Sequence, residues 1–145
     1  MPRLVLIALA LATLTAAPLA AQTVTCRVAH VHDGDTFGCA NGTRVRLLLI
    51  DAPDAGRFGG IARRALATLI PAGSRVTLET DSVPRDDQGR VLAYVYTGDG
   101  HLVNGILVRE GYAFFKPSRD NHKYADRLRE AEAEARSQQR GVWAP

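Results

Sequence analysis

Five segments of the chain have the apolar and polar pattern of β-strands, bounded by turn residues. A hairpin turn is indicated at Asn41-Gly42, so we expect the first three strands to form an antiparallel meander. The last strand leads through the turn at 97–100 into residues 101–103, which predicts a second hairpin. The predicted strands are residues 24–31, 36–40, 43–50, 75–79 and 91–96.

Three further segments have the apolar spacing of amphipathic helices: residues 60–70, 104–110 and 122–138. Gly141 follows the last of them, and we expect Trp143 to pack back onto the core. The order of these elements predicts an α+β domain, a five-stranded OB-fold β-barrel with three α-helices. This fold often binds nucleic acids, but a fold alone does not establish a function.

The first 21 residues have the composition of a secretory signal peptide. Arg3 supplies a positive charge, residues 4–16 form an apolar run, and small residues surround Ala20 and Ala21. The run is shorter than the roughly 20 residues that cross a bilayer as a helix, which favours cleavage over an uncleaved anchor. We therefore expect a secreted or periplasmic protein with one domain, residues 22–145.

Length, composition and charge narrow the class of protein only slightly. A chain of 145 residues with 46% apolar and 23% charged residues suits one globular domain, and is neither disordered nor collagen-like. The net charge of +3 permits an anionic partner but is too small to require one. Function has to be argued from local motifs.

The two cysteines, Cys26 and Cys39, lie on the first two predicted strands, on either side of a turn. In an exported protein we expect them to form a disulfide, which for a loop of this length stabilises a fold by about 3 kcal/mol in the chain-entropy model. Two buried free thiols are the alternative. A metal site with two cysteines is disfavoured, because no further ligands occur at zinc spacing.

Acidic and basic side chains occur near the ends of neighbouring strands. Asp35 precedes the second strand and Asp51 follows the third, so both carboxylates can reach one edge of the barrel. Converging carboxylates repel unless a cation joins them, and calcium accepts such oxygen ligands. Arg46 and Arg90 each offer a planar fork that matches two phosphate oxygens. Taken singly, each aspartate has the alternative of a turn residue and each arginine that of a solvated surface charge.

Together these motifs closely resemble the staphylococcal-nuclease-like, or thermonuclease, family. The resemblance rests on three ordered segments and continues through residues 103–111 and 131–143, so it covers essentially the whole of residues 22–145. The three segments are 33–36 (DGDT), 46–54 (RLLLIDAPD) and 86–96 (DDQGRVLAYVY).

The resemblance implies a secreted, calcium-dependent phosphodiesterase that cuts DNA and RNA with little sequence preference. By position in the motif, Asp35 and Asp51 would be calcium ligands, and the backbone carbonyl of Ala52 would be a third. The family chemistry is coherent, because calcium polarises a phosphoryl oxygen while positive side chains stabilise the charge that develops on the phosphate.

The same resemblance implies three catalytic residues. Arg46 and Arg90 would bind the scissile phosphate, and Asp54 stands where the family has the glutamate that activates the attacking water. Asp54 is one methylene shorter, and a misplacement of about 1 Å at a reacting group can cost on the order of a hundredfold in rate. The loop after Asp54 is also shorter than in the family and can offset or worsen this loss. His32 is an alternative base.

The family places tyrosines near the substrate where this chain has Phe114 and Phe115, followed by Lys116. A phenyl ring can stack on an unpaired base but cannot hydrogen-bond a phosphate. We expect these three residues to bind substrate, with burial in the core as the alternative for the two rings.

Two functions from different classes remain. The favoured one is a nuclease acting on DNA and RNA that are single-stranded or locally unpaired. The alternative is an OB-fold module that binds nucleic acid without cutting it, and Asp54 is the residue that separates the two. No protein partner is indicated, and we expect a monomer.

Overall fold

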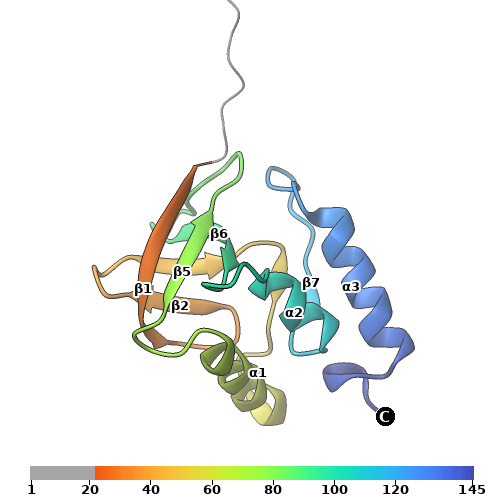
Figure 1. Ribbon diagram of the computed structural model, residues 1–145. Coiled ribbons are helices and arrows are strands. Elements are labelled where there is room, and N and C mark those ends of the chain that lie inside the picture. Colours follow the sequence, from red (N-terminus) through yellow and green to blue (C-terminus); the bar gives the residue numbers. More distant parts are fainter. Residues whose placement is uncertain (1–21) are drawn as a thin grey trace, which may run out of the picture.

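A closed five-stranded barrel forms the centre of the computed structural model, which describes residues 22–145 (Figure 1). The order around the barrel is β1-β2-β3-β6-β5, and only β3 and β6 are parallel neighbours. The predicted meander and OB-fold are therefore confirmed, whereas the predicted signal peptide lies outside the described residues. The strands are β1 (Thr23–Val31), β2 (Thr36–Cys39), β3 (Arg44–Leu47), β5 (Arg75–Glu79) and β6 (Val91–Tyr96).

Alternation along the strands fills the barrel with apolar side chains. Val28 on β1, Phe37 on β2 and Leu78 on β5 are all buried. On β1 the residues on either side of Val28 point outward and are exposed. Full burial of a side chain of this size stabilises a fold by about 1.5–3 kcal/mol. The same pattern that predicts the strands thus supplies the core.

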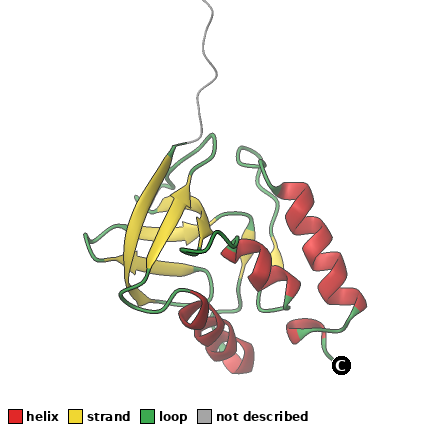
Figure 2. Ribbon diagram, in the orientation of Figure 1, coloured by secondary structure: helices red, strands yellow, loops and turns green. Residues whose placement is uncertain are grey.

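The three predicted helices are present and cover one end and one side of the barrel (Figure 2). They are α1 (Gly56–Leu69), α2 (Val103–Arg109) and α3 (Ala125–Ser137), followed by the short 3-10 helix η1 (Gly141–Trp143). Helix α2 packs between the barrel and α3 (Figure 1). None of the helices in the described part of the chain has the length and apolar content needed to cross a membrane.

Two helix boundaries differ from the prediction by more than one residue. Helix α1 begins at Gly56 rather than at residue 60, although glycine has a low helix propensity. Within this added turn, Gly59 packs closely on the backbone of Asp54. Helix α3 begins at Ala125 rather than at residue 122. Trp143 folds back as predicted but is partly exposed: it packs edge-on against Phe114, with ring centroids 5.3 Å apart, and does not belong to the buried core.

The prediction of one strand over residues 43–50 is wrong in its second half. Strand β3 ends at Leu47, and β4 (Ile50–Asp51) pairs instead with β7 (Phe114–Phe115) in a separate two-stranded sheet. Between them Leu49 has φ 61°, a left-handed conformation that costs an L-residue about 1–2 kcal/mol. Its carbonyl accepts a hydrogen bond of 2.8 Å from Lys116 N. This bend turns the chain out of the barrel just before Asp51.

The predicted second hairpin is also reduced. Leu102 pairs with Tyr96 only as an isolated bridge, and Val103 already begins α2. Burial of the α2 side chains against the barrel and α3 explains why these residues leave the extended conformation.

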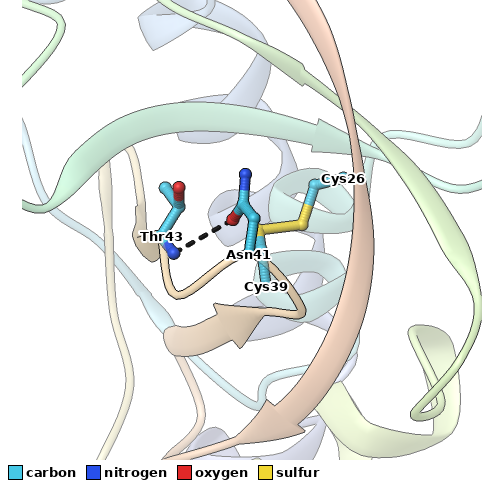
Figure 3. Close-up of a disulfide and its surroundings, with 4 residues drawn as sticks. All are labelled: Cys26, Cys39, Asn41 and Thr43. Atoms are coloured by element: carbon cyan, nitrogen blue, oxygen red, sulfur yellow. Dashed lines mark hydrogen bonds between the residues drawn. A yellow bond between two sulfur atoms is a disulfide. The ribbon is translucent and has the colours of Figure 1, made fainter.

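Cys26 and Cys39 form the expected disulfide, with their Cα atoms 5.8 Å apart (Figure 3). The two residues are not direct strand partners: Cys39 lies opposite Val28, and the register of β1 and β2 shifts just beyond that pair. Near the bond, Asn41 Oδ1 accepts a hydrogen bond of 3.0 Å from Thr43 N and closes the predicted turn (Figure 3). The disulfide therefore ties β1 to the β2–β3 hairpin.

Two carboxylates at the end of β5 hold α3 against the barrel. Glu79 is buried and is hydrogen-bonded by Lys123, Tyr124 and Tyr96. Burial alone would raise the pKa of Glu79, but these hydrogen bonds outweigh burial and hold the pKa below its usual value of 4.5. Asp81 behaves alike: burial opposes a lower pKa, and hydrogen bonds, the strongest from the backbone N–H of Lys123, outweigh it.

The folded protein lowers the pKa values of Glu79 and Asp81. Their contribution to stability is therefore fully present above the usual carboxyl pKa, and it is lost as the pH falls through the lowered pKa values of the folded protein. We expect the free energy of unfolding to decrease steeply below about pH 4.5, and the Glu79→Gln variant to show a flatter decrease. Urea unfolding at a series of pH values measures this. Equal pH dependence in the two proteins would contradict the role of Glu79.

Candidate active site

The turn before β2 holds Asp35 in a buried position. Asp33 Oδ1 accepts a hydrogen bond from Asp35 N at 3.0 Å, as Asx turns do. Asp35 Oδ1 accepts from the hydroxyl of Thr36 at 3.0 Å, and Asp35 Oδ2 accepts from Ala52 N at 2.8 Å. The carboxylate of Asp35 therefore joins the beginning of β2 to the segment that follows β4.

Arg46 lies between the two predicted metal ligands. Its Nη2 atom is 3.3 Å from Asp35 Oδ2 and 3.4 Å from Asp51 Oδ1. Because both carboxylate oxygens contact the same nitrogen atom, they lie close to each other. The Asp51 side chain is 54% exposed and that of Asp35 only 8%. Asp35, Arg46 and Asp51 thus meet at one edge of the barrel.

Burial is the main cause that raises the pKa of Asp35 above its usual value of 3.8. The Arg46 guanidinium and the Ala52 N–H oppose this rise, and the neighbouring Asp33 adds to it. Burial of Asp35 thus outweighs the contacts that favour its ionised form, and a further positive charge beside it would lower the pKa again.

Gly34 allows the segments around the site to pack closely. A Cβ atom at Gly34 would lie 2.6 Å from the Cβ atoms of both Ala52 and Ala62. This contact brings together the turn before β2, the segment after β4 and helix α1.

We expect the Gly34→Ala substitution to force these segments apart and to destabilise the protein by about 1–3 kcal/mol. Urea unfolding measures this effect. Gly60→Ala is the matched control, because Gly60 lies in α1 with only Arg64 Nη1 nearby at 3.5 Å, and alanine there should not lower stability. Equal stability of the two variants would contradict the close packing.

Three cationic side chains line an open pocket of about 270 Å³ beside this acidic pair. Arg46 comes from β3, Arg90 immediately precedes β6, and Lys116 follows β7. Arg46 therefore belongs both to the carboxylate pair and to the wall of the pocket. An arrangement of two guanidinium groups and an ammonium group suits an anion with several oxygens, such as a phosphodiester.

Asp86 orients Arg90 within this pocket. Arg90 Nε donates to Asp86 Oδ2 at 2.7 Å, and Asp86 Oδ1 accepts from the backbone N–H groups of Arg90 and Gln88, each at 3.0 Å. Burial by itself would raise the pKa of Asp86, but its hydrogen bonds with Arg90 and Gln88 outweigh burial and lower it. Within residues 22–145 the side chain of Arg90 uses only Nε for hydrogen bonding. Its two terminal nitrogens are therefore free to bind a ligand.

Asp54 is exposed in the loop between β4 and α1, and its side chain makes no hydrogen bond within residues 22–145. Helix α1 packs closely on the backbone of Asp54, because a Cβ atom at Gly59 would lie 2.7 Å from the carbonyl carbon of Asp54. Asp54 does not line the cationic pocket, and neither does His32, the alternative base.

The two phenylalanines lie beside the site rather than in the wall of the pocket. Phe114 is the strand partner of Asp51 and packs against Trp143. The guanidinium carbon of Arg129 lies over the Phe115 ring, 5.3 Å from the centroid of that ring. Both rings are half-buried. Of the three predicted substrate-binding residues, the pocket therefore contains Lys116, and a role of the rings in binding stays a prediction.

Asn104 on α2 is a structural determinant of the site that the sequence patterns do not identify. It is fully buried, accepts a hydrogen bond of 2.9 Å from Val95 N, and donates one of 2.9 Å to the carbonyl of Leu48. It thereby holds the bend that places Asp51. The signal in the sequence is an amide within an apolar segment that ends at Arg109.

The residues fit a hard cation with oxygen ligands. Among residues 22–145 no group of three or more His, Cys, Asp and Glu side chains surrounds a common point. The protein would supply two carboxylates, Asp35 and Asp51, and other ligands would come from backbone carbonyls, water or substrate oxygens. Calcium tolerates such a mixed oxygen shell better than zinc does.

Comparison with known proteins connects this arrangement with nucleases. A family model described as "Staphylococcal nuclease homologue" matches residues 44–145. Thermonuclease of Staphylococcus intermedius is 34% identical over 126 residues, which cover 80% of this chain and 74% of that protein. An uncharacterized endonuclease of Escherichia coli is 35% identical over 121 residues, which cover 81% of this chain and 76% of that protein.

Other relatives are longer than this chain. Endonuclease YhcR of Bacillus subtilis is 32% identical over 134 residues, which cover 80% of this chain but only 11% of YhcR. An uncharacterized protein of Bacillus anthracis is 35% identical, and the chain spans 62% of its length. The similarity to these proteins thus concerns one part of each.

Proposed function

The chain belongs to the staphylococcal nuclease family, and on that premise we propose that it is a secreted, calcium-dependent endonuclease that hydrolyses phosphodiester bonds of DNA and RNA. One observation carries the proposal: Arg46 contacts both Asp35 and Asp51 and also lines the pocket that contains Arg90. A cation site and a phosphate site therefore adjoin each other. Relatives named thermonuclease and endonuclease support hydrolysis over binding alone.

Each residue has a separate part in the proposed reaction. Asp35, Asp51 and the carbonyl of Ala52 would hold calcium, which when bound polarises a phosphoryl oxygen. Arg46 and Arg90 bind the phosphate and stabilise the charge that develops on it. Asp54 orients or deprotonates the attacking water, and its exposed side chain is free to turn toward a bound substrate.

The proposed substrate range follows from what the pocket contacts. Arginine and lysine bind phosphates irrespective of the base sequence, and phosphates are common to DNA and RNA. We therefore propose little sequence preference, and cleavage of strands that are single or locally unpaired, whose bases can stack on a half-buried phenylalanine ring beside the pocket.

The alternative function is a module that binds nucleic acid without cutting it. The exposed position of Asp54, outside the cationic pocket, favours this alternative. Covalently closed, single-stranded circular DNA separates the two functions, because only an endonuclease opens a circle. We expect linear and shorter products with calcium and intact circles with a chelator. Circles that are retained by the protein but stay intact under both conditions would establish the binding module instead.

We expect the Asp54→Glu substitution to raise the cleavage rate by about tenfold, because the longer side chain brings the carboxylate closer to the phosphate. Initial rates on single-stranded DNA measure this effect. Asp87→Glu, a change of the same kind at an exposed residue outside the pocket, should have no effect. A slower Asp54→Glu enzyme would show that the short loop already places Asp54 correctly.

We also propose that residues 1–21 direct export and are then removed, and that the protein acts as a monomer. Mass spectrometry of protein recovered outside the cytoplasm should show a chain that begins near Gln22. Recovery of the whole chain in the membrane fraction would contradict cleavage, and light scattering tests the oligomeric state.

A further inference from the structure

We propose that His30 and His32 form a binding site for a late first-row transition-metal cation, such as Ni²⁺ or Cu²⁺. The site is separate from the carboxylate pair and does not depend on the proposed nuclease function. His30 lies on β1 and His32 directly follows that strand. Residues two apart in an extended chain point to the same side, so both imidazoles reach the same patch of surface, where both residues are exposed.

The two rings converge through the nitrogens that bind metals. The Nε2 atoms of His30 and His32 are 2.9 Å apart, and the rings are nearly perpendicular, with an interplanar angle of 79°. Two bonds of about 2.05 Å that meet at a right angle place their nitrogens about 2.9 Å apart. This is the spacing of adjacent ligands in the square-planar and octahedral sites that Cu²⁺ and Ni²⁺ adopt. A metal ion bound by both nitrogens would take the place of the hydrogen bond between them.

The neighbouring backbone is shaped to receive the His30 ring. His30 lies opposite Gly38 on β2, directly after a shift in the register of the two strands. A Cβ atom at Gly38 would lie 2.7 Å from Cε1 of His30 and 3.2 Å from its Nε2. The irregularity aims the ring across the neighbouring strand, and the glycine leaves room for it. Both features bring His30 toward His32.

Donor chemistry separates this site from the proposed calcium site. Imidazole nitrogen suits nickel, copper and zinc, whereas calcium takes oxygen ligands. Within residues 22–145 no third acidic or sulfur ligand completes a cluster, and both cysteines are held in the disulfide. The remaining coordination positions would be taken by water, so that binding is of modest affinity and is not displaced by calcium.

Calorimetric titration of Ni²⁺ into the purified, tag-free protein, in excess calcium and near neutral pH, tests the proposal. We expect one Ni²⁺ per chain, and affinity reduced roughly tenfold or more in His30→Gln and in His32→Gln, because each loses one of two protein ligands. Glutamine can still hydrogen-bond to the remaining ring, so a purely structural pair would tolerate these changes. His101→Gln, at an exposed histidine paired with Asp99, is the matched control and should bind like the wild type.

A second variant keeps both histidines. Gly38→Ala should displace the His30 ring and weaken Ni²⁺ binding while circular dichroism shows an intact fold, so it decides the question if a glutamine variant unfolds. Absence of Ni²⁺ binding to the wild type would overturn the proposal. So would binding that is unchanged in the two glutamine variants, or unchanged in Gly38→Ala.

Discussion

Replacement of Arg90 by alanine is expected to slow the cleavage of single-stranded DNA by about a hundred- to a thousandfold, the effect of removing one oriented donor from a site where charge develops. The Arg90 guanidinium lines the pocket, and Asp86 holds it through Nε at 2.7 Å. The fold should persist, because the backbone N–H of Arg90 keeps its own hydrogen bond to Asp86. Initial rates at saturating calcium, together with urea unfolding, measure both expectations.

Arg44→Ala is the matched control for this experiment. Arg44 contacts the same loop, with Nη2 3.0 Å from the carbonyl of Gln88, but it lies outside the pocket. Its loss should leave the rate nearly unchanged. A full rate for Arg90→Ala, or equal losses in the two variants, would remove Arg90 from the proposed machinery.

Replacement of Asp51 by asparagine is expected to raise the calcium concentration needed for half-maximal activity by about a hundredfold, since a charged ligand becomes neutral without changing shape. Asp51 is the better test of the two metal ligands, because its side chain is 54% exposed whereas Asp35 is buried and tied to Ala52 N. Stability should therefore change little. Calcium titrations of the cleavage rate measure the shift.

Asp120→Asn provides the control for Asp51→Asn. The Asp120 side chain is 58% exposed and lies 3.9 Å from Arg119, so the same change of charge occurs away from the site. An equal calcium requirement in wild type, Asp51→Asn and Asp120→Asn would show that Asp51 is no ligand.

The meeting of Asp35 and Arg46 could be predicted because it depends on local patterns. Asp35 directly precedes one predicted strand and Arg46 lies on the next, where it pairs with Thr36, so the antiparallel meander brings the two side chains together. Alternation of apolar residues is enough to establish that meander. For the same reason the barrel agrees with the prediction, and the disulfide agrees with it because its two cysteines lie on neighbouring strands of that meander.

The bend at Leu49 could not be predicted, because its causes are distant in the sequence. Leu47 to Ile50 is uniformly apolar and extends the strand pattern, whereas hydrogen bonds from Lys116 N and from the Asn104 side chain hold the left-handed turn. The pairing of β4 with β7 depends on the same bend. Local sequence patterns do not predict such long-range contacts, although these contacts decide where Asp51 lies.

Calorimetric titration of calcium into the purified protein tests most directly whether Asp35 and Asp51 hold a cation beside the two arginines. We expect one calcium ion per wild-type chain, and binding weakened by about a hundredfold in Asp51→Asn. No calcium binding by the wild type, or the same affinity in both proteins, would contradict a cation site at this edge of the barrel.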